Sequence, residues 1–317
     1  MRTPGNNTVL SRGWPRVTSS RRGLGYGVAA YLLWGLFPLF WPLLKPAGAV
    51  EILAHRIVWS LVVVVVILAA QRRWRWIEAI LRRPGRLALL GTAAALIGVN
   101  WATYIYGVNS GQIVETSLGY FINPLVTVLL GVVVLRERLR PIQWVALAIG
   151  TVAVLVLALD YGRVPWIALA LAFSFGAYGL IKKVVSMDAV QGLTVETAAL
   201  FVPALAYLLF IGGGTFTASG PPHMALLASA GLVTAIPLLL FGAAARRLPL
   251  STIGLLQYLS PALQFLLGVI VYGEPMPRSR LIGFALVWVA LIVLTVDGLA
   301  NRQRRGTPAP QLEPVPL

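Results

Sequence analysis

The segment NPLVTVLLGVVVLRE at residues 123–137 recurs as SPALQFLLGVIVYGE at residues 260–274. Seven of the fifteen aligned positions are identical. Matching leucines and valines carry little weight between two apolar segments, but a proline, a glycine and a glutamate also match in register. These three pairs are Pro124/Pro261, Gly131/Gly268 and Glu137/Glu274. They indicate an internal duplication of a strongly apolar unit.

The composition places this duplication in a lipid bilayer. Of the 317 residues, 58% are hydrophobic and 11% are charged, and the mean hydropathy is +0.82. A soluble domain is about 45–50% apolar and about 25% charged. The apolar excess excludes a soluble enzyme, a disordered protein and a coiled coil, and it predicts an all-α integral membrane protein. With no cysteine and two histidines, the chain suggests neither a disulfide nor a thiolate or all-histidine metal site.

Ten apolar runs follow one another, each close to the roughly 20 residues that a helix needs to span a bilayer. Strands of an outer-membrane barrel would be about half as long and would alternate in polarity, which these runs do not. The sequence therefore predicts ten transmembrane helices. The runs cover residues 24–44, 50–70, 87–107, 113–135, 141–159, 165–183, 194–212, 223–244, 250–272 and 281–298.

The basic residues divide unequally between the two sides that ten spans create. With a cytoplasmic N-terminus, 21 of the 26 Lys and Arg residues fall in inside segments and four in outside segments, while Arg56 lies within the second span. Because short basic loops stay in the cytoplasm, we expect both termini there. The basic clusters are thus topology signals and do not predict a nucleic-acid partner.

The duplication and the span count together predict two inverted halves. The first five spans form a repeat at 24–159, and the last five form a repeat at 165–298. Because five is odd, the second half enters the membrane from the opposite side, a common architecture of secondary transporters. Residues 1–23 and 299–317 are expected to be disordered cytoplasmic tails.

The paired prolines fall near the middle of the fourth and ninth spans. A proline removes an amide donor and weakens the carbonyl four residues earlier, at Tyr120 and at Gln257. We expect Pro124 and Pro261 to act as hinges beside the solute path. A simple packing kink is an equally good explanation of either residue.

Longer motifs occur in the same order as in a known family. They are EILAHRIVWS at 51–60, GVNWATYIYGVNSG at 98–111, ETSLGYFINPL at 115–125, LRERLRPIQW at 135–144, LAFSFGAYGLIKK at 171–183, PLLLFGAAARRLPLSTIGLLQYLSP at 237–261 and VYGEPM at 271–276. These motifs resemble the RarD family, bacterial inner-membrane proteins with EamA-type repeats within the drug/metabolite transporter superfamily. The resemblance covers about residues 25–297 and implies ten helices, an inverted repeat, transport and a bacterial inner membrane. It implies no particular solute and no binding residues.

The second span carries three ionisable residues close together. Glu51 and His55 share a helix face because they are four residues apart, and Arg56 lies about 9 Å into the span at the helical rise. An arginine at that depth is costly unless it is paired or faces water, so we expect Glu115 or Glu51 to neutralise it. The group suggests a charged gate, a substrate anchor or a proton-linked pair. An interfacial ion pair with a snorkelling arginine is the alternative.

Amide and aromatic side chains gather near the middle of several spans. Amides are costly against lipid, so we expect them to line the bundle interior and the solute path. An aromatic cavity with a few amides suits an uncharged or cationic organic solute. Hydrogen bonding between helices is the alternative for each residue alone. The residues assigned to the path are Glu51, His55, Arg56, Asn100, Trp101, Tyr104, Glu115, Tyr120, Asn123, Gln257 and Tyr258.

The sequence thus favours a secondary transporter, a permease or exporter that moves a small organic solute by alternating access and uses no cofactor. The sequence shows no Walker motif, which disfavours ATP-driven pumping. Direction, coupling to protons and formation of a homodimer stay open. Two alternatives remain, a membrane-embedded enzyme acting on a lipid-linked substrate and a scaffold that transports nothing. The enzyme is disfavoured because no span carries paired carboxylates and the sequence shows no His/Asp metal set.

Overall fold

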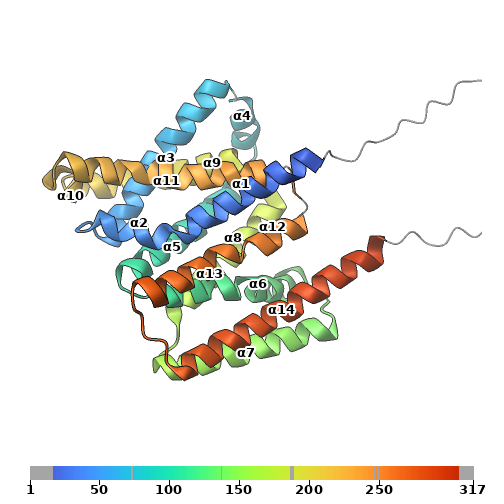
Figure 1. Ribbon diagram of the computed structural model, residues 1–317. Coiled ribbons are helices and arrows are strands. Elements are labelled where there is room, and N and C mark those ends of the chain that lie inside the picture. The colour runs from blue at the N-terminus through green and yellow to red at the C-terminus, as the bar shows by residue number, and fades with distance from the viewer. Residues whose placement is uncertain are drawn as a thin grey trace, which may run out of the picture.

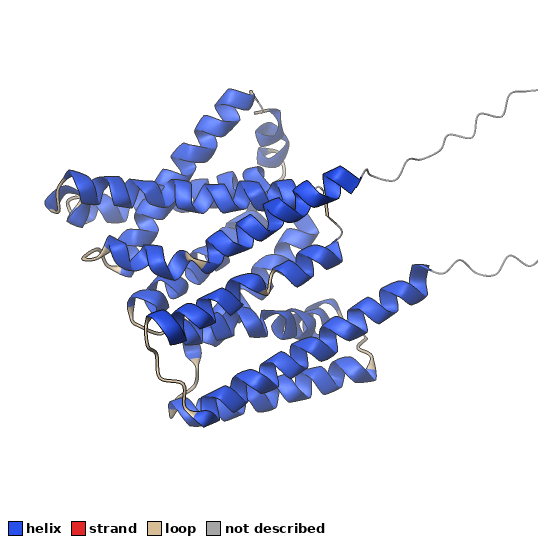
Figure 2. Ribbon diagram, in the orientation of Figure 1, coloured by secondary structure: helices blue, strands red, loops and turns tan. Residues whose placement is uncertain are grey.

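The part of the chain that the structure describes is helical and contains no strand (Figures 1 and 2). This computed structural model describes residues 17–72, 74–136, 138–185, 189–245, 247–248 and 250–306. The helices up to residue 161 are α1 (Val17–Gly35), α2 (Phe37–Phe40), the short 3-10 helix η1 (Trp41–Leu44), α3 (Ala49–Gln71), α4 (Arg75–Leu81), α5 (Pro84–Asn109), α6 (Ile113–Leu135) and α7 (Pro141–Tyr161). The later helices are α8 (Trp166–Val185), α9 (Ala189–Phe210), α10 (Gly214–Ala218), α11 (Pro221–Ala245), α12 (Leu250–Leu256), α13 (Leu259–Leu266), the π-helical turn η2 (Leu267–Val271) and α14 (Arg278–Gly306).

The start of α1 and the end of α14 lie at the same end of the bundle (Figure 1). We call this the terminal end and the opposite one the far end. The far end carries α10 and the connections at 45–48, 110–112, 162–165 and 272–277. Segments that are far apart in the sequence therefore meet at the far end.

By length and composition, eight helical segments within the described residues can cross a membrane. They are Ala49–Ala70, Pro84–Asn109, Ile113–Val134, Pro141–Tyr161, Val190–Phe210, Pro221–Ala245, Thr252–Val271 and Arg278–Gly298. A ninth span results if Arg21–Gly35 and Phe37–Leu44, which bend by 42° against each other, cross together. The apolar part of α8, Trp166–Lys182, is shorter. The class of an all-α, multi-pass membrane protein is confirmed, whereas ten spans in two repeats stay a prediction.

Two helices extend beyond the apolar runs that predict them. α1 begins at Val17 and α14 continues to Gly306, outside the apolar limits of 24 and 298. An apolar run marks the stretch that lipid surrounds, whereas a helix can continue into water with its backbone hydrogen bonds intact. The predicted tails therefore overlap helices at 17–23 and 299–306. Residues 1–16 and 307–317 lie outside the described residues.

The two aligned prolines occupy different local structures. Pro124 lies inside the continuous helix α6, whereas Pro261 lies in the first turn of α13, after a break at Gln257 and Tyr258. The amides of a first turn have no acceptor within the helix, so a proline there removes no helical hydrogen bond. The two prolines thus lie inside corresponding candidate spans, Ile113–Val134 and Thr252–Val271, but differ in the continuity of the helix around them. Their role as hinges stays a prediction.

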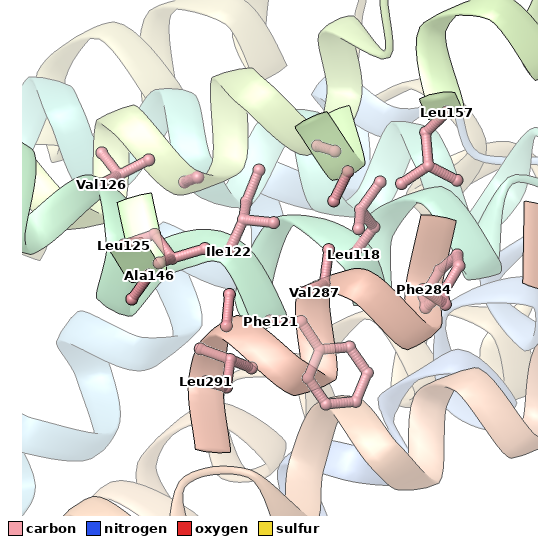
Figure 3. Close-up of a cluster of buried hydrophobic side chains, with 14 of the residues drawn as sticks. Leu118, Phe121, Ile122, Leu125, Val126, Ala146, Leu157, Phe284, Val287 and Leu291 are labelled. Atoms are coloured by element: carbon pink, nitrogen blue, oxygen red, sulfur yellow. The ribbon is translucent and has the colours of Figure 1, made fainter. Parts of the chain in front are cut away.

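The largest apolar core joins α6 to α7, α8 and α14 (Figure 3). Phe121 of α6 meets Phe284 of α14 edge to face, with their ring centroids 6.4 Å apart. Small residues allow the close approach of these helices, since a Cβ atom added at Gly150 of α7 would lie 2.6 Å from Leu125 of α6. A larger residue at Gly150 would therefore require the side chain of Leu125 to move.

Ion pairs at both ends align α7 antiparallel to α14. Arg140 lies 2.5 Å from Asp297 at the terminal end, and Arg280 lies 2.8 Å from Asp160 at the far end. Two pairs at opposite ends fix both the direction and the register of the two helices. The pair of α7 and α14 thus supports one side of the bundle, and the ionisable residues of α3 lie elsewhere in it (Figure 1).

Candidate functional site

Arg56 of α3 lies among aromatic side chains from several helices. Its Cζ atom is 4.1 Å from the ring centroid of Trp101, 5.1 Å from that of Trp41 and 5.8 Å from that of Phe37. Tyr104 of α5 and Tyr120 of α6 belong to the same buried cluster as Phe37 and Trp41. We call this group the Arg56 cluster. It comprises Phe37, Trp41, Arg56, Trp101, Tyr104 and Tyr120.

Two prolines explain why the first helical stretch bends at the Arg56 cluster. Pro38 lies in the first turn of α2, and Pro42 lies in the first turn of η1. A proline inside a longer helix would remove a hydrogen bond and clash with the preceding turn, so the helix breaks before each one. The resulting bend carries the rings of Phe37 and Trp41 to the guanidinium of Arg56.

Arg56 has no carboxylate partner within the described residues. It is 4% exposed, it makes no ion pair or hydrogen bond there, and its Nε atom is buried without an acceptor. The prediction that Glu115 or Glu51 neutralises Arg56 is wrong. Each of these carboxylates binds another group, as their contacts show.

Glu115 of α6 binds Arg163 and the start of α8. Its Oε2 atom lies 2.6 Å from Nη2 of Arg163, and its Oε1 atom accepts a 3.0 Å hydrogen bond from the amide of Ile167. Amides in the first turn of a helix lack an intrahelical acceptor, and the helix dipole favours a negative charge there. Through these contacts Glu115, which is 1% exposed, joins α6 to the start of α8.

Glu51 of α3 binds the start of α10. Its Oε1 atom accepts hydrogen bonds from the amide of Thr215 at 2.7 Å and from its hydroxyl at 2.8 Å. The same hydroxyl lies 3.0 Å from Nε2 of His223. Because its single proton is donated to Glu51, we infer that His223 donates through Nε2. His55 stacks on Phe216 of α10 at 4.7 Å, so Glu51 and His55 share a face, as their spacing predicts.

Asn100 of α5 connects the Arg56 cluster to α8. Its Nδ2 atom donates to the carbonyl of Leu171 at 3.0 Å and to Oγ of Ser174 at 3.1 Å. Its Oδ1 atom accepts a 3.2 Å hydrogen bond from the hydroxyl of Tyr120. The ring of Tyr120 lies 5.7 Å from that of Tyr104, whose buried hydroxyl has no partner. The amide thus uses its donors and its acceptor within the bundle.

The structure brings some of the predicted path residues together and separates others. Arg56 contacts Trp101, and Asn100, Tyr104 and Tyr120 are joined to it through the buried cluster that contains Phe37 and Trp41. The others lie apart from it. Asn123 lies beside Gly176 of α8, Gln257 lies at the break before α13, and Tyr258 packs against the core of α6, α7 and α14.

Residues after η2 make hydrogen bonds to other segments at the far end. The Tyr272 hydroxyl donates to the carbonyl of Pro38 at 2.7 Å. The carboxylate of Glu274 accepts the amides of Ile113 at 2.5 Å and Val114 at 2.9 Å, the first two residues of α6. Burial raises the pKa of the Glu274 carboxyl, and the two amides counteract that shift. These contacts join the chain around residue 272 to α2 and to α6.

Sequence reasoning missed several residues of the site. Phe37 and Trp41 lie in an apolar run with no polar signal, although the prolines beside them indicate a bend. Thr215 contacts Glu51 from 164 positions away, His223 contacts Thr215 in turn, and no spacing pattern connects Glu51 to either residue. In the sequence, Arg163 is interpreted only as a basic residue of an outside loop. Its pairing with Glu115 requires knowledge of which loops meet at the far end.

An apolar groove lies between α6, α7 and α8, away from the Arg56 cluster. Its volume is about 190 Å³, and Thr151 is the polar side chain among the residues that line it. Apolar grooves on the outside of a membrane bundle are expected to contact lipid tails. The groove has no charged or amide side chain that could orient a polar solute.

Comparisons with known proteins identify relatives along most of the chain. The model of the EamA-like transporter family matches twice, at residues 21–159 and 164–296. The chain is 59% identical over 287 residues to "Protein RarD" of Streptomyces exfoliatus, which covers 90% of this chain and 91% of that protein. It is 44% identical to "Uncharacterized transporter YojE" of Bacillus subtilis, over 87% of this chain and 94% of that one. The chain is also similar to a protein of known crystal structure, with a TM-score of 0.55 and 19% sequence identity. The match covers 89% of this chain and 99% of the other chain, and at this identity it shows a similar fold alone.

Proposed function

The chain belongs to the EamA-like transporter family, and on that premise we propose a secondary transporter that moves a small organic solute across a bacterial inner membrane by alternating access. Relatives that carry the word transporter in their names support transport over the alternatives of an enzyme or a scaffold. The proposal extends to a path for the solute through the bundle and to a mechanism that opens one end at a time.

The proposed architecture is ten spans in two inverted five-helix repeats, at 24–159 and 165–298, with both termini in the cytoplasm. Two matches of one family model, of similar length and in tandem, support the repeat. The unequal distribution of Lys and Arg supports the orientation. Reporter fusions after Arg86 and after Arg305 should both indicate the cytoplasm, and a periplasmic signal at either point contradicts the orientation.

We propose that the Arg56 cluster is the solute site. The observation that carries this proposal is a buried guanidinium with aromatic neighbours and no carboxylate partner among the described residues. Ionisable residues inside membrane bundles are costly and usually functional. A residue that served only as an interfacial anchor would extend its charge into the headgroup region, whereas Arg56 is buried against three rings.

Alternating access would require the far end to open and close. In this structure, Glu274 and Tyr272 connect the far end to α6 and α2, which supports a role for these contacts in closing it. We propose that release of these contacts, with bending of α6 and α13 near Pro124 and Pro261, opens the site at the far end. The packing of α13 directly against α6 supports a coupled movement of the two helices.

Protons are the proposed coupling ion. His55 is buried with both ring nitrogens unpartnered, and it lies next to Arg56 in the chain and one helical turn from Glu51. Around it, Glu51 and His223 are the titratable groups joined through Thr215. A histidine in such a position can gain a proton when solvent reaches it. Replacing His55 by Gln should therefore leave solute exchange intact while removing uptake driven by a pH gradient.

Reconstitution tests the function directly. Purified wild-type protein and the variants Arg56→Ala and Arg86→Ala would be placed in liposomes and assayed with a metabolite panel. Arg86 is exposed, so its variant controls for the loss of one arginine. We expect saturable flux from the wild type and Arg86→Ala and a roughly 10- to 100-fold loss in Arg56→Ala, the range for one charge-assisted contact. Product formation without flux would favour the enzyme, and neither activity would favour the scaffold.

A further inference from the structure

The Arg56 cluster contains more hydrogen-bond donors than acceptors. The Nε atom of Arg56, Nε1 of Trp41 and the hydroxyl of Tyr104 are all buried without a partner. Arginine and tryptophan side chains can only donate. The amide oxygen of Asn100, Oδ1, already accepts a hydrogen bond from Tyr120. The protein thus leaves a cation and neutral donors unsatisfied in one place.

The carboxylates that could supply a counter-charge are occupied. Glu51 accepts two hydrogen bonds from Thr215, and Glu115 is held by Arg163 and by an amide of α8. The aromatic rings stabilise the guanidinium through their faces, but a ring face offers no lone pair to its N–H groups. Part of the cost of burying this charge therefore remains uncompensated in the described structure.

We infer that the transported solute is an organic anion whose carboxylate binds the guanidinium of Arg56. A carboxylate offers two acceptor oxygens that match the planar donors of a guanidinium. The rings of Phe37, Trp41 and Trp101 would contact an apolar or aromatic body of the solute. This inference rests on the proposed function and replaces the sequence-based expectation of an uncharged or cationic solute, because a fixed buried cation repels a second one.

Matched probes separate charge from shape. Phenylacetate, phenylacetamide and 2-phenylethylamine share one aromatic body and carry an anionic, a neutral and a cationic head. Hexanoate, hexanamide and hexylamine form the aliphatic counterpart. Binding to purified wild-type protein in detergent would be measured as concentration-dependent protection of a single cysteine at Ser60. This buried residue lies one helical turn from Arg56, and the chain has no cysteine of its own.

We expect a carboxylate of either series to protect the cysteine at concentrations at least tenfold below those of its amide, and we expect no protection by the amines. Arg56→Lys should bind the carboxylate more weakly but keep the preference over the amide, because it keeps the charge and loses the planar donors. Arg56→Gln should lose the preference. Arg86→Ala, the exposed control, should behave as wild type.

Three results would overturn the anion site. They are equal protection by amide and carboxylate, a retained preference in Arg56→Gln, and no protection by any carboxylate. Flux assays in liposomes keep this outcome separate from the proposed function. Flux of amides or amines without carboxylates refutes the anion and leaves transport in place. Carboxylate binding without flux of any solute refutes transport and leaves the anion site in place.

Discussion

The contact of Glu274 with α6 gives a prediction about the far end. Replacing Glu274 by Ala removes the acceptor of the Ile113 and Val114 amides. Each buried donor left without an acceptor costs about 1–3 kcal/mol. Glu274 is partly exposed, so water can replace part of the lost interaction with the two amides. The alanine variant also avoids the cost of burying a carboxylate, the same burial that raises the pKa of Glu274, and this gain offsets another part of the loss. We therefore expect a loss of about 1–2 kcal/mol for both amides together, which shifts the far end about 5- to 30-fold toward the open state.

Cysteine labelling measures this shift. Ser117 is fully buried one turn beyond Val114 in α6, and Ser117→Cys changes little in size. In proteoliposomes, an impermeant maleimide should modify this cysteine about 5- to 30-fold faster in the Glu274→Ala background. Ser110→Cys, exposed at the same end, should be modified equally in both backgrounds. Glu78→Ala is the matched control, because this glutamate pairs with Arg82 on the surface of α4.

Unchanged labelling of Ser117→Cys in the Glu274→Ala background would refute the reasoning. It would mean that other contacts, such as the bond from Tyr272 to Pro38, hold the far end closed without Glu274. Faster labelling in the Glu78→Ala background as well would also refute it, because the effect would then follow the loss of any carboxylate.

Two further predictions concern stability. Arg163→Ala should lower the free energy of unfolding by about 1–2 kcal/mol, because Glu115 stays buried and loses its cation. The side chain of Arg163 is 40% exposed, so this loss is smaller than for a fully buried ion pair. Thermal unfolding in detergent would measure it. Gly231→Leu should lower the melting temperature strongly, since a Cβ atom there would lie 2.5 Å from the backbone of Trp59, whereas Gly25→Leu, with open space around it, should not. A melting temperature equal to wild type in either destabilised variant would contradict the corresponding contact.

The fold was predictable to the extent that lipid determines it. α6 spans the same residues, 113–135, as the apolar run that predicts it, because that run is bounded by polar and charged residues at both ends. The break between α12 and α13 was not predictable in the same way. Residues 250–272 are apolar enough to form one helix, and hydropathy does not record the turn at Gln257 and Tyr258 or the π-helical turn at Leu267–Val271.

The pairing of charges was predicted wrongly for a single physical reason. Glu51, Glu115 and Glu274 all lie at the far end, and each accepts at least one backbone amide from the start of a helix that does not contain it. A helix start offers unsatisfied amides and a positive dipole, which suit a carboxylate in a poorly solvated place. Sequence gives the depth of Arg56 in its span but not which helix start lies beside each glutamate. The same choice that satisfies the three carboxylates leaves Arg56 without one.

The proline pair is where the symmetry of the sequence and that of the structure differ. Pro124 and Pro261 align in the repeat, yet α6 runs unbroken through the first and a new helix begins just before the second. Two copies of one motif in two conformations are what an inverted-repeat transporter needs, because the conformations of the halves exchange when access changes sides. A proline permits both forms, since it weakens a helix in its interior and fits into a first turn without loss. On this argument the opposite-facing state has a break near Tyr120 in α6 and a continuous helix through Gln257.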